Sequence, residues 1–272
     1  MTIKHIHIEE VDSTNRYLRY YRRTEGEDIT FVWSESQTAG RGCGTNTWES
    51  EAGKNLTFSV LLHPLRVPAA SQFIISMANA LALREALLAY TPHIVIKWPN
   101  DIYWHDRKLA GTLIENKLYQ GGIRDSIVGT GLNVNQEVFL SDAPNPVSLS
   151  QILGHTLDRD EVRAKLVDCL THYFGLLDND NEWATIRQRY HEALYRRNEE
   201  HRYRTADGRL FHATLRHVED DGTLVLAEDS PSGSHDLRFG FKEVEFVIER
   251  PLSERRNTNN IKIDYFHEVS KS

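Results

Sequence analysis

A glycine-rich loop is the first segment of this chain whose residue types could do chemistry. The run Gly40-Arg41-Gly42-Cys43-Gly44 places three glycines within five residues, so backbone amides there can approach a ligand closely and form an anion-binding nest. The guanidinium of Arg41 suits a carboxylate or a phosphate. The run is not a P-loop, and a predicted strand rather than a helix follows it, which disfavours a dinucleotide site. Taken alone, it is equally well a mobile surface loop.

Two lysines lie around a predicted turn between two strands. Lys97 opens the run Lys-Trp-Pro-Asn-Asp at 97–101, and Lys108 lies in Asp-Arg-Lys-Leu-Ala-Gly at 106–111. A lysine on a rigid hairpin supplies a fixed positive charge for a phosphate anion that develops during a reaction. Proline, asparagine and aspartate are also ordinary turn residues, and either lysine could be a solvated surface charge. The residues alone leave both interpretations open.

Hydroxyl and amide side chains cluster at Asp12-Ser13-Thr14-Asn15, at the start of a predicted helix. An N-cap explains this run fully, and the spacing favours that interpretation. Hydroxyls that both donate and accept also suit a ligand that mixes N–H and C=O groups. The 13 histidines show neither HExxH nor paired ligand spacing, so we expect no metal site built from protein ligands. The GxSxG element of many hydrolases is also absent.

The elements that must position these residues predict an α+β domain. Short apolar or alternating runs predict strands at 3–8, 29–33, 56–62, 94–97, 102–104, 109–115 and 123–128. Helical spacing predicts helices at 15–23, 71–90, 158–177 and 182–193. The glycine-bearing loop, 34–47, follows the second strand, and residues 98–101 join the fourth strand to the fifth.

The pattern changes from about Tyr203 onward. Short strands are predicted at 203–205, 210–215, 223–227, 237–239 and 245–248, and Asp-Gly or Ser-Gly turns separate several of them. Asp-Gly between short alternating runs is a strong hairpin signal, so we predict a small β-barrel. The predicted organisation is a first domain at 1–200, a small barrel domain at 201–250 and a polar tail at 251–272.

Length and composition narrow the class of protein. A chain of 272 residues with 40% hydrophobic residues buries enough surface to need no covalent staple. No run approaches the ~20 apolar residues of a membrane span, and the N-terminus lacks a signal-peptide core, so we expect a soluble, cytoplasmic protein. Cys43 and Cys169 are the only cysteines, which fits a reducing compartment. A net charge of -7 disfavours sequence-blind nucleic-acid binding.

Taken in order, the motifs resemble those of a biotin–protein ligase. They are V-D-S-T-N, E-S-Q-T-A-G-R-G, K-W-P-N-D-I-Y, D-R-K-L-A-G-T-L-I-E and G-T-G-L-N-V-N, within residues 8–140. K-W-P-N-D followed by R-K-L-A-G is the most specific combination. The resemblance implies a mixed sheet with flanking helices, of the class II synthetase-like fold shared with lipoate ligases, and a small C-terminal SH3-like β-barrel.

The resemblance also implies a reaction in two steps. The biotin carboxylate attacks the α-phosphate of ATP, which gives biotinoyl-5′-AMP and pyrophosphate with Mg²⁺ assisting. A lysine of a biotin carboxyl carrier protein domain then attacks the acyl carbon, and AMP leaves. ATP and biotin are therefore the expected substrates and the carrier domain is the expected partner. Mg²⁺ is expected with ATP, and the motifs name no protein ligands for it.

Matching the family motifs position by position implies roles for individual residues. Lys108 is the first candidate for catalysis, together with Arg41 and Asp101. The positions implied to border biotin are Ser13, Thr14, Asn15, Gln37, Gly40, Arg41, Gly42, Cys43, Lys108 and Gly111. The positions implied to bind ATP or the adenylate are Arg41, Trp48, Lys97, Asn100 and Asn133, of which Trp48 matches the residue that stacks on adenine.

The sequence departs from the family in two places. Cys43 stands where many members have a second arginine. We hypothesise that the adenylate is held less tightly here, because one contact to its phosphate is missing or is made by backbone amides. Only twelve residues precede Ser13, which leaves no room for the helix-turn-helix domain of some relatives, so we expect an enzyme that does not bind DNA. A homodimer stays open, since some relatives dimerise through sheet edges.

Two other functions stay open. A lipoate or octanoate ligase or transferase shares the fold and the acyl transfer to lysine, and the Gly-Arg-Gly loop before K-W-P-N-D favours biotin over these acids. A non-catalytic biotin sensor is the second alternative, and the presence of Lys108 counts against it. An RNA-binding barrel would need interleaved aromatic and basic residues at 203–248 and an overall basic charge, and neither occurs.

Overall fold

The computed structural model describes residues 2–64, 66–141, 145–231 and 233–248. Its larger part is a seven-stranded sheet in the order β1-β2-β3-β7-β6-β5-β4. The strands are β1 (Ile3–Val11), β2 (Ile29–Gln37), β3 (Leu56–Leu62), β4 (Ile94–Lys97), β5 (Asp101–Trp104), β6 (Arg107–Tyr119) and β7 (Gly122–Leu132). β1 and β2 run parallel and the other neighbours run antiparallel, so the predicted mixed sheet is confirmed.

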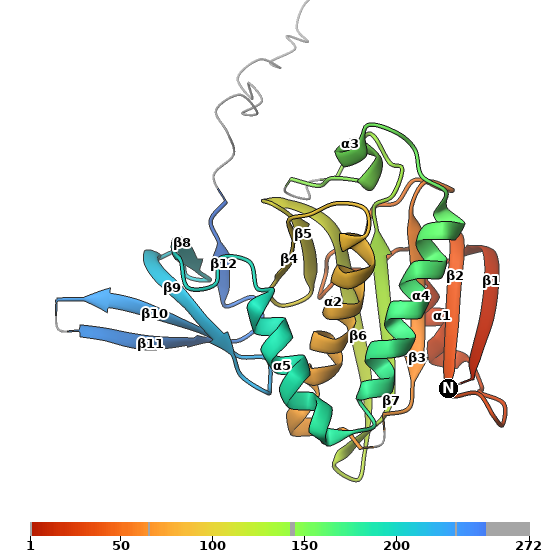
Figure 1. Ribbon diagram of the computed structural model, residues 1–272, viewed down its shortest axis with the longest axis horizontal. Coiled ribbons are helices and arrows are strands. Elements are labelled where there is room, and N and C mark those ends of the chain that lie inside the picture. The colour runs from red at the N-terminus through yellow and green to blue at the C-terminus, as the bar shows by residue number, and fades with distance from the viewer. Residues whose placement is uncertain (1, 65, 142–144, 232, 249–272) are drawn as a thin grey trace, which may run out of the picture.

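Helices lie on both faces of this sheet. α2 (Phe73–Leu88), α4 (Arg159–Leu176) and α5 (Trp183–Glu192) lie together over one face, as Figure 1 shows. α1 (Thr14–Tyr20) packs against the opposite face. The remaining helical elements of the described ranges are α3 (Leu149–Leu153) and the 3-10 turns Ala69–Ser71 and Asp180–Glu182. The predicted arrangement of flanking helices is therefore confirmed.

The two-residue period of the strands explains why both faces are covered. Neighbouring residues of a strand point to opposite faces. In β2, Val32 packs with Leu18 of α1, while its neighbour Phe31 joins the large core cluster. In β7, Ile127 likewise belongs to the cluster with Leu18, and its neighbour Val128 belongs to the large core cluster. These strands are apolar on both faces, so each face needs a helix to exclude water.

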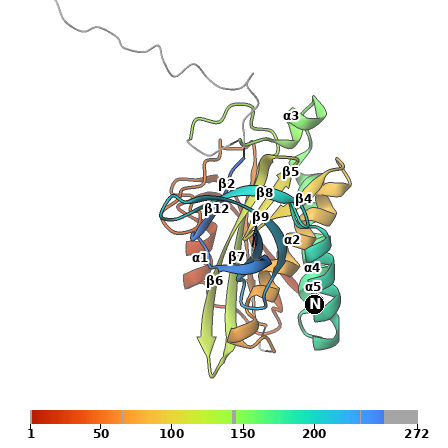
Figure 2. The ribbon, with the colours of Figure 1, turned by 90° about the vertical axis from the view of Figure 1, so that its left-hand side faces the viewer.

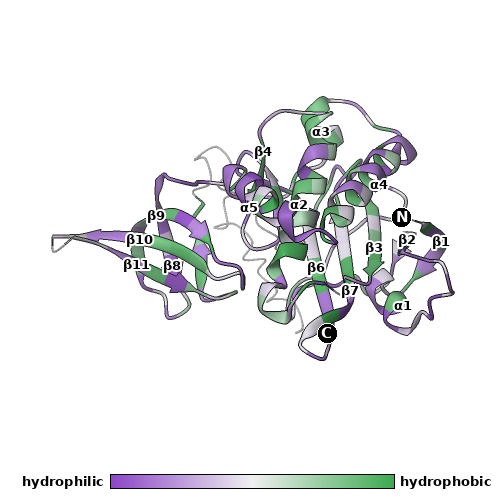
Figure 3. Ribbon diagram, turned by 60° about the horizontal axis from the view of Figure 1, so that its bottom comes forward, coloured by the Kyte–Doolittle hydropathy of each residue, from purple (hydrophilic) through white to green (hydrophobic). Residues whose placement is uncertain are grey.

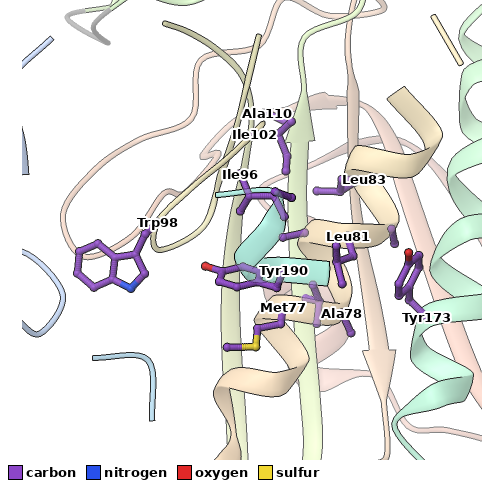
Figure 4. Packing of buried hydrophobic residues seen from close by; sticks show 14 of the residues in the cluster. Met77, Ala78, Leu81, Leu83, Ile96, Trp98, Ile102, Ala110, Tyr173 and Tyr190 are labelled. Atoms are coloured by element: carbon purple, nitrogen blue, oxygen red, sulfur yellow. The ribbon is translucent and has the colours of Figure 1, made fainter. Parts of the chain in front are cut away.

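α2 is the central helix of the large core. It is rich in alanine, leucine and isoleucine nearly all round, which is typical of a helix that is buried between other layers. Figure 4 shows members of α2 beside members of the sheet: Met77, Ala78, Leu81 and Leu83 of the helix and Ile96, Ile102 and Ala110 of the strands. No helix in the described ranges combines the length and the apolar character that crossing a membrane requires.

The C-terminal part forms a second sheet. Its strands β8 (Glu200–Thr205), β9 (Leu210–Val218), β10 (Leu224–Ser230), β11 (Gly233–Phe239) and β12 (Val244–Phe246) pair antiparallel in the order β11-β10-β9-β8-β12. Figures 1 and 3 show this sheet on one side of the large one, and Figure 2 views it from that side. Because β11 and β12 do not pair within the described residues, the predicted SH3-like closed barrel is not confirmed.

A continuous core joins the two sheets. The indole Nε1 of Trp98 donates to the Gly222 carbonyl at 2.9 Å, and the Trp98 side chain is buried. Tyr195 stacks on Phe246 of β12 with ring centroids 6.2 Å apart. Residues of both sheets belong to one hydrophobic cluster. The division near residue 200 therefore stays a prediction, and the predicted tail at 251–272 lies outside the described residues.

The predicted boundaries of the strands agree with the structure for some strands and are too short for others. The predicted strands at 56–62 and 94–97 coincide with β3 and β4, whereas β1, β2, β6 and β7 extend beyond their predicted ranges into polar or glycine-bearing sequence. The prediction omits α3, although a signal for it exists. Ser148 and Gln151 form a capping box at its start, a pattern that marks a helix N-terminus.

Candidate active site

A cavity of about 1170 Å³ lies between the glycine-bearing loop, β5 to β7 and the second sheet. It is slightly larger than the range of about 300–1,000 Å³ that is common for ligand pockets. The predicted site residues that line it are Ser13, Thr14, Asn15, Gln37, Arg41, Gly42, Cys43, Trp48, Lys97, Asn100, Asp101, Lys108, Gly111 and Asn133. Gly40 is the exception, because it is buried and its carbonyl accepts from the Trp48 amide at 3.1 Å.

The start of α1 brings hydroxyl and amide groups to the cavity. Ser13 occupies the N-cap position, but its side chain makes no capping hydrogen bond, so the N-cap interpretation of this run is wrong for the side chain. The Thr14 amide donates to Gln37 Oε1 at 2.8 Å. Ser59 Oγ lies 2.6 Å from both Thr14 Oγ1 and Asn15 Oδ1. Ser59 is missing from the prediction, and a serine inside an apolar strand is the signal that could have found it.

The glycine-rich loop folds back on itself. The Gly42 amide donates to the Asn46 carbonyl at 2.8 Å, and the Trp48 amide donates to the Gly40 carbonyl, so residues 40–48 form a hairpin. These two amides point to loop carbonyls rather than into the cavity. The loop therefore differs from the open anion nest that the glycines suggest, and its side chains rather than these amides face the cavity.

Glycines of β6 and β7 form a flat surface under the Trp48 indole. A Cβ on Gly131 would lie 2.1 Å from Trp48 Cε2, and one on Gly111 would lie 3.0 Å from Trp48 Cζ3. A Cβ on Gly129, two residues earlier on the same face of β7, would lie 1.9 Å from Asn15 Oδ1. We call the cavity-facing residues of β5, β6 and β7 the floor. Gly129 and Gly131 lie in the quoted G-T-G-L-N-V-N motif but are missing from the predicted site residues.

The two lysines of the cavity lining, Lys108 on the floor and Lys97 at the end of β4, have different surroundings. Lys108 Nζ lies 2.7 Å from Asp101 Oδ1 and 5.7 Å from the centroid of the Trp48 ring. Lys97 Nζ lies 4.8 Å from the ring centroid of Phe246, a residue of the second sheet. Burial lowers the pKa of the Lys97 ammonium, and the Asp101 carboxylate acts in the opposite direction. Neither lysine is an exposed surface charge, so that interpretation is wrong.

The side chains of the loop are held against the sheet. Arg41 Nη1 lies 3.6 Å from Oε1 of Glu115, a carboxylate that also accepts a hydrogen bond from Asn15 at 3.0 Å. The Cys43 sulfur accepts a hydrogen bond from Asn100 Nδ2 at 3.0 Å. Burial raises the pKa of the Cys43 thiol, which keeps it neutral. The loop therefore presents one cation to the cavity, at Arg41, and a neutral sulfur at position 43.

The second sheet also lines the cavity, which the motifs did not predict. Arg204, Lys242 and Phe246 are among its contributions. They follow no recognisable motif, and only the packing of the second sheet against the large one brings them here. In the described ranges no group of three or more His, Cys, Asp or Glu side chains is arranged to hold a metal ion.

Comparison with known proteins identifies relatives of this architecture. The model of the biotin/lipoate A/B protein ligase family matches residues 8–133. A biotin--[acetyl-CoA-carboxylase] ligase from Paracoccus denitrificans is 31% identical over 204 residues, which cover 72% of this chain and 83% of that protein. The bifunctional ligase/repressor BirA of Bacillus subtilis is 27% identical over 237 residues, which cover 81% of this chain and 68% of that protein.

A solved structure of a biotin protein ligase has a similar fold. The biotin protein ligase from Aquifex aeolicus in complex with biotin and ATP superposes with a TM-score of 0.72 at 24% identity, covering 90% of this chain and 99% of that one. The shared fold extends over both sheets, and the sequence similarity to the Paracoccus ligase covers most of that protein. This chain therefore belongs to the biotin–protein ligases of the biotin/lipoate A/B protein ligase family.

Proposed function

We propose that this chain is an ATP-dependent biotin–protein ligase. It activates biotin as biotinoyl-5′-AMP and transfers the biotinoyl group to a specific lysine of a biotin carboxyl carrier protein domain. One observation carries the proposal: the residues that the family motifs single out come from distant parts of the chain and line one cavity. The named activity of the Paracoccus relative supports the same function.

The first step requires two anions to meet. A carboxylate oxygen of biotin attacks the α-phosphorus of ATP, and pyrophosphate leaves with the electron pair of the broken P–O bond. Lys108 and Arg41 are the cations proposed to offset this charge, because a fixed charge at the reacting atoms stabilises the transition state without reorganisation. The contact of Lys108 with Asp101 at 2.7 Å supports its role, since the carboxylate holds the ammonium in place.

Two groups of side chains are proposed to bind the organic parts of the substrates. The hydroxyl and amide network of Thr14, Asn15 and Gln37 supplies donors and acceptors for the ureido ring of biotin. Trp48 is proposed to stack on adenine, because an indole offers a flat face to a base. Lys97, Asn100 and Asn133 are proposed to lie near the adenylate.

The second step transfers the acyl group to the carrier. The neutral lysine amine of the carrier domain attacks the acyl carbon of the adenylate, and AMP leaves as the mixed anhydride breaks. Asp101 is the carboxylate proposed to face the incoming lysine. The 40–48 hairpin is proposed to close over the intermediate, which would exclude the water that hydrolyses a mixed anhydride. Mg²⁺ would arrive with ATP and neutralise phosphate charge.

The proposal also covers the domain organisation of the protein, its cellular compartment and the absence of DNA binding. Residues 1–200 would be the ligase domain, and residues 201–250 would be a second domain related to an SH3-like barrel. A β-bulge between Val225 and Leu226 supports curvature in that sheet. The protein would act in the cytoplasm without binding DNA. Limited proteolysis, gel-shift assays and sedimentation would test the domain division, the absence of DNA binding and a homodimer.

The exchange of labelled pyrophosphate into ATP tests the activity directly. It is measured with biotin, with lipoate, with octanoate and without any acid. We expect exchange with biotin alone, because only a reversible adenylate links pyrophosphate to ATP. Exchange with lipoate or octanoate instead would make the chain a ligase for that acid. No exchange with any acid, from protein whose fold is shown by circular dichroism, would favour a non-catalytic biotin sensor.

A further inference from the structure

A lysine of the second sheet lies against the tip of the glycine-rich loop. Lys242 belongs to the turn between β11 and β12, and its backbone has a left-handed φ of 68°. A Cβ added to Gly44 would lie 2.3 Å from Lys242 Nζ, so the ammonium rests directly on this glycine. The two turns therefore meet at the cavity, and a positive charge lies where they meet.

Lys242 differs from Arg41, Lys108 and Arg204, the cavity cations that lie beside carboxylates. Their partners are Glu115, Asp101 and Glu245, respectively. Lys97 and Lys242 instead lie against aromatic rings, with Nζ 4.8 Å from the Phe246 centroid and 5.8 Å from the Phe241 centroid. In the part of the chain that the structure describes, no carboxylate lies within ion-pair distance of Lys242. Its charge is therefore available to an anionic ligand without first breaking an ion pair.

The neighbouring position in the loop carries no charge. Cys43 is next to Gly44, and burial raises the pKa of its thiol above that of a free cysteine. Lys242 is close enough for its charge to act in the opposite direction on the same thiol. The loop thus lacks a cation at position 43, and the second sheet places one beside it.

We propose that Lys242 contacts the phosphate of the adenylate and the α-phosphate of ATP, and supplies the positive charge that residue 43 does not. This inference rests on the proposed function, since it needs the nucleotide to lie in this cavity. It revises the expectation that the adenylate is held less tightly here. Retention of the adenylate then depends on a residue of the second sheet rather than on the loop alone.

Substitution of Lys242 tests the contact. Lys242→Met keeps the aliphatic stem and the left-handed backbone but removes the charge. We expect the KM for ATP and the rate of adenylate release to rise about tenfold, the lower end for one charge-assisted hydrogen bond. The KM for biotin should change much less, since biotin carries no phosphate. Lys242→Arg should stay near wild type, and Lys165→Met, an exposed lysine on α4 far from the cavity lining, is the matched control.

A double-mutant cycle with Cys43→Arg tests whether the two positions serve one phosphate. If they do, an arginine at 43 should restore most of what Lys242→Met loses, so the two effects will not add. Additive effects would overturn the inference. Wild-type exchange together with unchanged constants in Lys242→Met would overturn the inference alone and leave the proposed function standing. If the wild-type protein shows no biotin-dependent exchange of pyrophosphate into ATP, the proposed function is overturned, and this inference with it.

Discussion

The floor of the cavity and its cover are built in opposite ways. The floor consists of hydrogen-bonded strands, on which the Lys108–Asp101 pair and Gly131 lie. The cover, residues 40–48 and 240–243, consists of two turns from distant parts of the chain whose tips are exposed. Charges on a sheet are placed before the substrates arrive, whereas turns can move as the substrates bind. The difference suggests that the floor supplies the chemistry and that the cover retains the intermediate.

Removing the charge from the floor should have the largest effect. We expect Lys108→Ala to lower biotin-dependent pyrophosphate exchange by about 10³-fold, as the loss of a main electrostatic contact does in other sites. The fold should persist, because the Lys108 side chain is 25% exposed and lies outside the core. Circular dichroism and the Tm check the fold. Near wild-type exchange in this variant would place catalysis elsewhere, with Lys97 the next candidate.

Adding a side chain at Gly131 should break the contact between the floor and the Trp48 indole of the cover. Gly131→Ala puts a Cβ 2.1 Å from the Trp48 ring, so the indole must leave its position. We expect the KM for ATP to rise about 30-fold, more than the loss of one stacking contact alone, because the loop is displaced as well. In a Trp48→Ala background the same substitution should add little, since the clash is gone. A full additional loss in that background would show that Gly131 acts without Trp48.

Removing the indole from the cover should have a smaller effect. We expect Trp48→Ala to raise the KM for ATP about tenfold, which corresponds to the loss of one aromatic stack on a base. Binding of biotin should weaken much less, because only adenine needs that stack. Isothermal titration with each ligand separates the two effects. Equal losses for ATP and biotin would contradict the stacking role.

Adding a charge to the cover should have the smallest effect. With Lys242 already supplying a positive charge, Cys43→Arg should slow release of the adenylate only about threefold, within the range of a solvent-exposed ion pair. Cys43→Ser is the neutral control and should match wild type. Release is followed from the isolated complex of protein and labelled adenylate. An unchanged rate would mean that position 43 does not reach the phosphate.

Predictions from the sequence are most accurate for the floor. Lys108, Asp101 and Gly111 lie in motifs on one hairpin, where strand pairing places residues of nearby sequence side by side. They are less accurate where a side chain has two local uses. Ser13 illustrates this, because its spacing suits an N-cap while its hydroxyl makes no capping bond. Lys97 could be taken for a surface charge, because one of the two rings against its ammonium comes from Phe246 in the other sheet.

The sequence by itself determined the order of the main elements, the mixed sheet and some of the residues that line the cavity. These follow from side-chain alternation, turn residues and motifs, all of which act over short stretches of chain. Only the tertiary structure decided that Lys242 meets Gly44 and that Trp48 lies on Gly131. Such contacts join residues far apart in the sequence, and they depend on how the whole core packs rather than on any local pattern.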